Sequence, residues 1–343
     1  MARSHIGMCR TAGWAVLACV SCVSHQGQKP QIASPPAVPN EQEQVVVEKP
    51  VAAPLMSLAP APPPGESDAA EVVTTAPALL VKDGFLAPRS VLYDAAADQY
   101  LVSNVNGAPD DADDNGFISR VTPDGKVAVL KWIDGAEPNV ELHAPKGMAI
   151  VDEVLYVADL DRIRKFSTRN GAALGTVAVP GASSLHDLSA APDGTIYFTD
   201  LGARIAGDRL EATGEDAVYK LVREQARVIV RGKQLSQPSG LWADASGVWV
   251  VSFGSNELFD VRSGSKTKIR KLPAKQLEGI IKSNDGGLYV SSWEANQILT
   301  GGPGGAFQPI YDIQSPADIG YDPKRNWLLI PSTLDNTIKL QPL

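Results

Sequence analysis

The chain has 343 residues and a formal net charge of −8 at pH 7. No basic stripe offsets this charge, so we do not expect nucleic acid as a partner. All three cysteines lie within the first 22 residues, which excludes a disulfide or a cysteine nucleophile from the rest of the chain. No phosphate-loop motif G-x-x-x-x-G-K-[ST] occurs, so no nucleotide site is expected either.

The first 22 residues are typical of an export signal. Two arginines precede an apolar run at residues 11–20, which is too short to span a bilayer and fits the core of a signal peptide. Cys19 and Cys22 each end a short box that resembles the one before the lipid-modified cysteine of bacterial lipoproteins. Two alternatives stay open: a lipoprotein anchored to a membrane only through Cys19 or Cys22, or a secretory signal that is cleaved. Both predict an exported protein, either membrane-anchored or periplasmic or extracellular.

A proline-rich stretch follows the signal. Residues 28–78 contain eleven of the 26 prolines and few aromatic residues, so they cannot bury enough apolar area to order themselves. We therefore predict a disordered Pro/Ala-rich linker over residues 23–77 and one folded domain over residues 78–343.

The folded part contains six versions of one hairpin pattern. The clearest is QPSGLWADASGVWVVSF from Gln237 to Phe253, in which a Pro-x-Gly lead-in precedes two short apolar strands joined by a polar turn. When the six copies are aligned, equivalent positions are Ser90, Gly147, Asp187, Gly240, Gly279 and Asp318. Three of the five intervals between these positions are 39 or 40 residues, and the other two are longer, at 57 and 53 residues. In an all-β chain this period predicts a propeller.

Two more strand-like runs follow each hairpin except the last. The sequence therefore predicts an all-β, six-bladed propeller with four antiparallel strands in each blade. The sixth copy is followed by one strand only, NTIKLQPL, before the chain stops at Leu343. We expect the segment that begins at Ala78 to supply the missing outer strand and so to close the ring.

We expect many polar side chains to lie together at one mouth of the central channel. The start of the first strand and the end of the second strand of each blade lie on the same face of a propeller. The candidate binding residues on this face are Arg89, Lys146, His186, Asp187, Ser239, Glu278, Asp318, Asn104, Asp159, Asp200 and Trp293. Two long loops, residues 104–115 and 201–216, overhang the same mouth, and long loops on a rigid scaffold commonly form binding sites.

Several of these residues have a structural alternative. Asp187 and Asp318 would also serve as caps for neighbouring backbone amides. His186 would also be an ordinary hydrogen-bonded histidine, and Trp293 would also pack between blades. Glu278 fits a purely structural role least well, because its carboxylate is aimed at a channel lined by Arg89 and Lys146.

A second candidate site is an acidic loop. Asp111, Asp113 and Asn115 follow the order D-x-D-x-N-G, which would place three oxygens around a calcium ion. Thr122 stands where a helix-loop-helix calcium site requires its bidentate glutamate, so that kind of site is excluded. A calcium loop between strands, or a solvated acidic loop, remains.

The repeated lead-ins, the segment LHDLSAAPDGTIYFTD and the segment SPADIGYD together resemble the family of senescence marker protein, gluconolactonase and luciferin-regenerating enzyme. The resemblance covers about residues 80–343. It implies a six-bladed propeller with a divalent metal, calcium or zinc, in the channel mouth. In the lactonases of this family a glutamate, two asparagines and an aspartate supply the metal and substrate contacts. The matching positions here are Arg89, His186, Ser239 and Glu278, and all four differ.

These differences suggest two classes of function. His186 and Glu278 could still ligate a metal, but Arg89 brings a fixed positive charge to a place where a metal needs an anionic ligand. We therefore expect a monomeric, catalytically diverged propeller of the cell envelope that binds a small polar or anionic ligand, or an envelope protein, at the mouth. The alternative is a divalent-metal-dependent lactone hydrolase with an altered ligand set.

Overall fold

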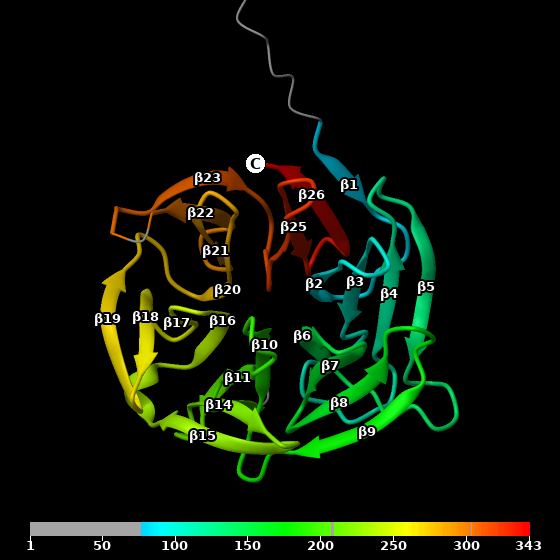
Figure 1. Ribbon diagram of the computed structural model, residues 1–343, viewed down its shortest axis with the longest axis horizontal. Coiled ribbons are helices and arrows are strands. Elements are labelled where there is room, and N and C mark those ends of the chain that lie inside the picture. Colours follow the sequence, from blue (N-terminus) through cyan, green and yellow to red (C-terminus); the bar gives the residue numbers. More distant parts are fainter. Residues whose placement is uncertain (1–76, 207–208, 303) are drawn as a thin grey trace, which may run out of the picture. The chain divides into compact units, whose positions relative to one another are not determined.

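Six four-stranded antiparallel sheets surround a central axis in the folded part of the chain (Figure 1). The computed structural model describes residues 77–206, 209–302 and 304–343. Cys19, Cys22, the signal and all but the last residue of the predicted linker lie outside these residues. The six-bladed propeller with four antiparallel strands per blade is confirmed.

Blades one to three follow the order of the chain. Their strands, from the axis outward, are β2 (Pro88–Asp94), β3 (Gln99–Asn104), β4 (Phe117–Val121) and β5 (Val127–Asp134); β6 (Pro145–Val151), β7 (Val154–Asp159), β8 (Arg162–Ser167) and β9 (Ala173–Ala178); and β10 (Leu185–Ala190), β11 (Ile196–Asp200), β14 (Ala217–Val222) and β15 (Gln225–Arg231). A separate hairpin, β12 (Ala203–Ala206) and β13 (Arg209–Ala212), stands in the long connection of blade three.

Blades four to six continue the same pattern. Their strands are β16 (Pro238–Asp244), β17 (Gly247–Ser252), β18 (Glu257–Arg262) and β19 (Ser265–Lys271); β20 (Leu277–Lys282), β21 (Leu288–Ser292), β22 (Gln297–Gly301) and β23 (Gln308–Asp312); and β24 (Gly320–Asp322), β25 (Trp327–Ser332), β26 (Thr337–Pro342) and β1 (Leu79–Val81). One short 3-10 helix, Lys233–Leu235, leads into blade four. Among the described residues no helix is long and apolar enough to cross a membrane.

The two ends of the folded region meet in the last blade. Strand β1 pairs antiparallel with β26, with Leu79 opposite Leu340 and Val81 opposite Ile338. The predicted closure by the N-terminal strand is therefore confirmed. The pairing covers a sheet edge that would otherwise expose unpaired backbone groups.

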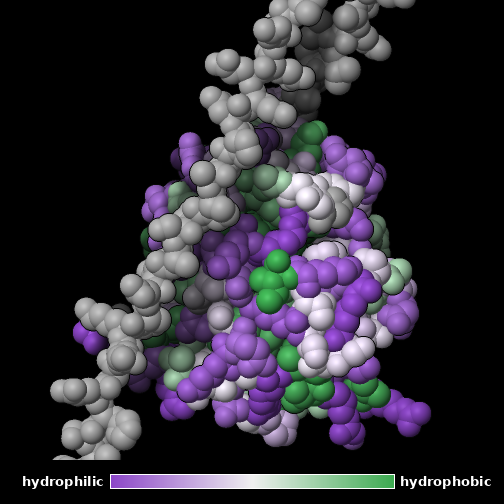
Figure 2. All heavy atoms as spheres, turned by 90° about the vertical axis from the view of Figure 1, so that its left-hand side faces the viewer, coloured by the Kyte–Doolittle hydropathy of each residue, from purple (hydrophilic) through white to green (hydrophobic). Residues whose placement is uncertain are grey.

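The core consists of six apolar clusters, and each cluster lies between two neighbouring blades. The cluster between blades two and three, for example, contains Ile163, Phe198 and Tyr219. Successive side chains of a regular strand point to opposite faces, so each sheet contributes side chains to the cluster on either side of it. The outer surface is different: Figure 2 shows mostly hydrophilic residues with small separate hydrophobic spots on the side that it displays.

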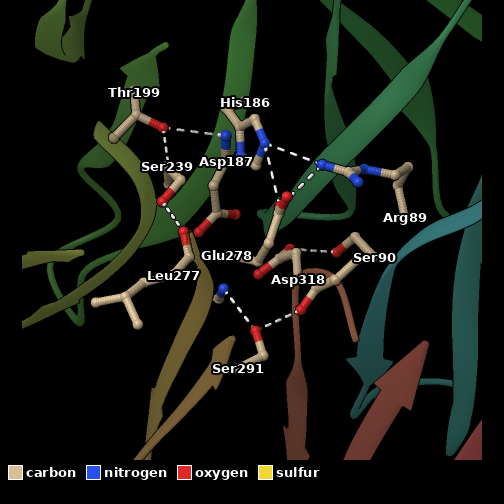
Figure 3. A network of polar contacts seen from close by, with 12 residues as sticks. Arg89, Ser90, His186, Asp187, Thr199, Ser239, Leu277, Glu278, Ser291 and Asp318 are labelled. Carbon is tan, nitrogen blue, oxygen red and sulfur yellow. Dashed lines mark hydrogen bonds and ion pairs between the residues drawn. The ribbon is translucent and has the colours of Figure 1, made fainter. Parts of the chain in front are cut away.

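The innermost strands of blades one to five each carry a β-bulge near their start. In blade three the pairing jumps from Leu185 opposite Asp200 to Leu188 opposite Phe198, so the inner strand has one extra residue. The same shift recurs in β2, β6, β16 and β20. A bulge breaks the alternation of side chains along a strand. As a result, two successive residues of one inner strand, such as His186 and Asp187, both point into the axial network (Figure 3).

Candidate functional site

The bulges produce two layers of residues around the axis. The first, which we call the mouth ring, consists of Arg89, Lys146, His186, Ser239, Glu278 and Ala317. The second, which we call the axial ring, follows one residue later and consists of Ser90, Gly147, Asp187, Gly240, Gly279 and Asp318.

Glycine is required in the axial ring because neighbouring strands approach closely there. A Cβ atom on Gly147 would lie 2.5 Å from both Cα and Oδ1 of Asp187. A Cβ atom on Gly279 would lie 2.5 Å from the backbone nitrogen of Ile319. The space at the axis is therefore left to the side chains of Ser90, Asp187 and Asp318.

Asp187 and Asp318 form a buried pair of carboxyl groups. Burial raises the pKa of both, and the charge of Asp318 is the next cause for Asp187. Two carboxyl groups in such a site share one proton. Asp187 also accepts from the backbone nitrogens of Leu188 at 2.7 Å and Leu241 at 2.8 Å, so the backbone-capping role does apply to it. Ser90 donates to Asp318 at 2.6 Å.

Above this pair, Arg89, His186 and Glu278 form a charged network in the mouth ring (Figure 3). Arg89 Nη2 lies 2.9 Å from Glu278 Oε2 and 3.0 Å from His186 Nε2, and His186 Nε2 lies 3.3 Å from the same Glu278 oxygen. Although burial raises the pKa of Glu278, Arg89 and His186 together lower it below its ordinary value. Burial lowers the pKa of His186, so the ring is neutral near pH 7 and accepts from the guanidinium. The Arg89 guanidinium also lies 5.6 Å from the ring centre of Trp293, a cation–π contact.

Lys146 is the exception in this ring. Its side chain is buried, and its Nζ has no hydrogen-bond partner within the described chain. Burial, followed by repulsion from Arg89, lowers the pKa of Lys146 to about 8, while the carboxylates of Asp159, Asp110 and Asp200 oppose this shift. His186 Nδ1 is a second buried nitrogen without a partner there. Two buried donors of the same ring are therefore unsatisfied.

A cavity of ≈ 430 Å³ lies over the mouth ring. Its charged walls include Arg89, Lys146, Glu278, Asp110 and Arg204, the neutral His186 lies among them, and its apolar walls include Leu201, Ile205, Leu210, Phe253, Trp293 and Leu334. The two long connections that the sequence places over this mouth meet here, because Ile205 donates its backbone N–H to Asp110 at 3.2 Å. A volume of this size is typical of small-molecule sites.

The polar residues at the ends of the second strands have structural partners instead. Asn104 accepts from the backbone of Leu86 at 3.0 Å, and Asp200 accepts from the backbone of Ser184 at 2.9 Å. Asp159 accepts from the backbone of Ala144 at 2.8 Å and pairs with Arg164 at 2.8 Å. These side chains hold the lead-in of their own blade and do not line the cavity.

Ser239 likewise serves the backbone. It is fully buried, and its hydroxyl donates to the carbonyl of Leu277 at 2.6 Å and lies 3.2 Å from that of Val251. Its hydroxyl hydrogen thus joins blade four to blade five.

The side chains of the mouth do not fit a divalent metal. Of the four positions that the family resemblance singles out, only His186 and Glu278 carry metal-ligating groups, and both are held by the Arg89 guanidinium. A cation at that point would face Arg89 and Lys146 without enough anionic ligands. In the acidic loop, the Asn115 amide donates to Asp113, and Asp111 remains outside that contact. Within the described ranges, no group of three or more His, Asp or Glu could hold a metal ion.

Two features of the site could not be found from the sequence. The hairpin β12–β13, with its exposed Ile205 and Leu210, had no recognisable strand pattern. The unsatisfied state of Lys146 depends on distances between blades, which no local pattern records.

Comparison with solved structures agrees with this architecture. A gluconolactonase from Xanthomonas campestris superposes with a TM-score of 0.61 at 19% sequence identity, over 78% of this chain and 89% of that one. Virginiamycin B lyase from Staphylococcus aureus superposes with a TM-score of 0.54 at 15% identity, over 78% of this chain and 98% of that one. These likenesses establish the fold alone. The structural neighbours include gluconolactonase-like six-bladed propellers. No protein-family model and no curated protein matches the sequence.

Proposed function

We propose that the propeller binds a small anionic ligand at the channel mouth without a metal and without lactone hydrolysis. The observation that carries this proposal is the Lys146 ammonium group, which is buried beside the cavity and has no partner among the described residues. An unpaired buried charge is costly, and a ligand anion would relieve that cost.

The charges of the mouth favour an anion over a cation or a neutral molecule. The carboxylate of Glu278 offsets the guanidinium of Arg89, which leaves the charge of Lys146 uncompensated in the ring. His186 supports the same ligand, because its Nδ1, which carries the proton when Nε2 accepts from Arg89, is a further donor without an acceptor. Charge-assisted hydrogen bonds of this kind are about twice as strong as neutral ones.

A metal-dependent lactone hydrolase is less well supported. That reaction uses the metal as a Lewis acid or to activate water. Here the guanidinium of Arg89 lies against the two groups that would have to hold the ion. The site lies at the channel mouth, where the family resemblance places the metal of the lactonases, but its charged residues differ. This difference supports the binding of an anion over hydrolysis.

The cellular setting that we propose rests on the first 22 residues only. Their apolar run, with Cys19 and Cys22, supports an exported domain, anchored by a lipid or released. A ligand or partner of the cell envelope follows from that setting.

The proposal is tested by calorimetric titration of the full chain, treated with a chelator, with hexanoate and with hexanamide. These probes have nearly the same size and differ in charge. We expect hexanoate to bind at one site about tenfold to a hundredfold more tightly, as a charge-assisted contact implies. Equal affinities would contradict the proposal. Chelator-sensitive hydrolysis of D-glucono-1,5-lactone would favour the hydrolase.

A further inference from the structure

The cavity over the mouth ring has an apolar collar above its charged floor. Ile205 and Leu210 are directly opposite each other on the hairpin β12–β13, and both line the cavity. Phe253, after β17, and Leu334, in the turn between β25 and β26, also line it. We call Ile205, Leu210, Phe253 and Leu334 the collar.

The collar is unusual because its aliphatic side chains line one cavity and yet remain exposed to solvent. Ten large hydrophobic side chains of the described residues are exposed, and three of them, Ile205, Leu210 and Leu334, line this one cavity. Leu334 is 63% exposed. Several others, such as Ile269 on β19, lie singly on outer strands, where an exposed apolar residue is ordinary. Exposed apolar residues that gather at a concave site indicate a ligand that covers them.

The floor limits the charge of that ligand. Arg89 is paired with Glu278, and His186 is neutral, so Lys146 is the cation of the mouth ring that has no ion pair or hydrogen bond among the described residues. One negative charge satisfies it. A second carboxylate on the ligand would lose its hydration on entering the cavity. The mouth ring has no further unpaired cation to compensate for that cost.

We infer that the ligand is an amphiphilic monoanion, with a single carboxylate on the Lys146 side and an apolar body against the collar. This inference rests on the proposed anion site and specifies its ligand class. The hairpin β12–β13 then determines specificity through Ile205 and Leu210, and the mouth ring supplies the charge contact. Small hydrophilic acids fill the floor but leave the collar exposed.

The test is the chain-length dependence of binding to the full chain. Butanoate, hexanoate and octanoate are titrated together with the three matching amides. Each methylene buried against the collar strengthens binding by about threefold to fourfold. The double variant Ile205→Thr/Leu210→Gln is expected to flatten this dependence while butanoate affinity changes little. Ile269→Thr changes another exposed isoleucine, which lies away from the cavity; it is the matched control and leaves the dependence unchanged.

The outcomes separate this inference from the proposed function. Carboxylates that bind equally well at all lengths, but better than their amides, overturn the amphiphile and leave the anion site in place. Acids and amides that show the same length dependence and the same affinity overturn the anion site. An unaltered length dependence in the hairpin double variant, with its thermal unfolding unchanged, overturns the assignment of the collar.

Discussion

Two sets of buried charged side chains lie near the same mouth, and their hydrogen bonds differ. Asp159 accepts from the backbone of His143 at 3.1 Å and of Ala144 at 2.8 Å, and it pairs with Arg164 at 2.8 Å. Lys146, two residues after Ala144, has no partner among the described residues. Both side chains are buried. Burial of a charge therefore does not distinguish a structural residue from a binding residue, but the number of its satisfied hydrogen bonds does.

The comparison predicts opposite effects on stability. A fully satisfied buried charge contributes through its partners, which its removal would leave unpaired. An unsatisfied buried charge costs free energy in the unliganded protein, and its removal relieves that cost.

The largest effect is expected for Asp159→Ala. The change leaves the buried Arg164 with the half-exposed Glu141 as its ion-pair partner and a hydrogen bond to Thr176 at 3.3 Å, and it uncaps two backbone N–H groups. We expect the free energy of unfolding to fall by about 3–5 kcal/mol, measured by urea denaturation. Asp161→Ala removes an exposed surface pair with Arg162 and serves as control, with a loss below about 1 kcal/mol. Equal losses for the two variants would remove the distinction between the two sets.

The second effect has the opposite sign. Lys146→Met nearly keeps the length of the side chain and removes its charge. We therefore expect the free energy of unfolding to rise by about 1–3 kcal/mol at pH 7, consistent with the lowered pKa of Lys146. The folded-state pKa of about 8 lies below the ordinary value of 10.5, so the cost is present below pH 8 and disappears as the pH rises toward 10.5. The gain from the variant should therefore shrink over that range. A loss of stability at pH 7 would show that Lys146 is structural.

The third expectation concerns ligand binding as a function of pH. Because the pKa of Lys146 is lowered to about 8, its ammonium form is mostly lost between pH 7 and pH 9. Hexanoate affinity should fall by about tenfold over this interval, since the acid itself stays ionised. The charged groups around Lys146 are Arg89, Asp159, Asp110 and Asp200, and the neutral His186 adds no charge in this range. Affinity that is constant from pH 7 to pH 9 would assign the anion to Arg89 instead.

The smallest effect is expected in the axial ring. Asp318 accepts a hydrogen bond from Ser90, so it has more partners than Lys146 but fewer than Asp159. The pKa of Asp318 is raised by burial, so the folded state favours its protonated form and its ionisation costs stability above the ordinary pKa of 3.8. Asp318→Asn cannot ionise and still accepts from Ser90. We expect a gain of about 1 kcal/mol at pH 8 that vanishes near pH 4, measured by urea denaturation at both values. A loss at pH 8 would mean that the ionised pair is stabilising.

Much of the fold was predictable from the sequence, because each blade repeats one local pattern. The six lead-ins and their spacing predicted six blades, and the unpaired end near Leu343 predicted closure by a strand near Ala78. The same alignment brought Arg89, Lys146, His186 and Glu278 together, since topologically equivalent positions of a propeller meet at its axis. These residues were found without any knowledge of their partners.

The remaining features depend on contacts between segments that are distant along the chain. The partners of Asp159 include backbone groups 15 and 16 residues earlier, and those of Asp187 include Leu241, 54 residues later. The bulges that turn both His186 and Asp187 toward the axis depend on how two strands pair, and no single strand encodes that pairing. Whether a polar group is satisfied is therefore a property of the folded molecule.

The most direct test of the central claim is the titration of hexanoate into chelator-treated wild-type chain and Lys146→Met, with the exposed Lys82→Met as a charge-matched control. The account predicts one metal-independent site in the wild type and in Lys82→Met, and at least a tenfold loss of affinity in a Lys146→Met variant that remains folded. Hexanoate binding that survives in Lys146→Met, or that requires calcium or zinc in the wild type, would contradict it.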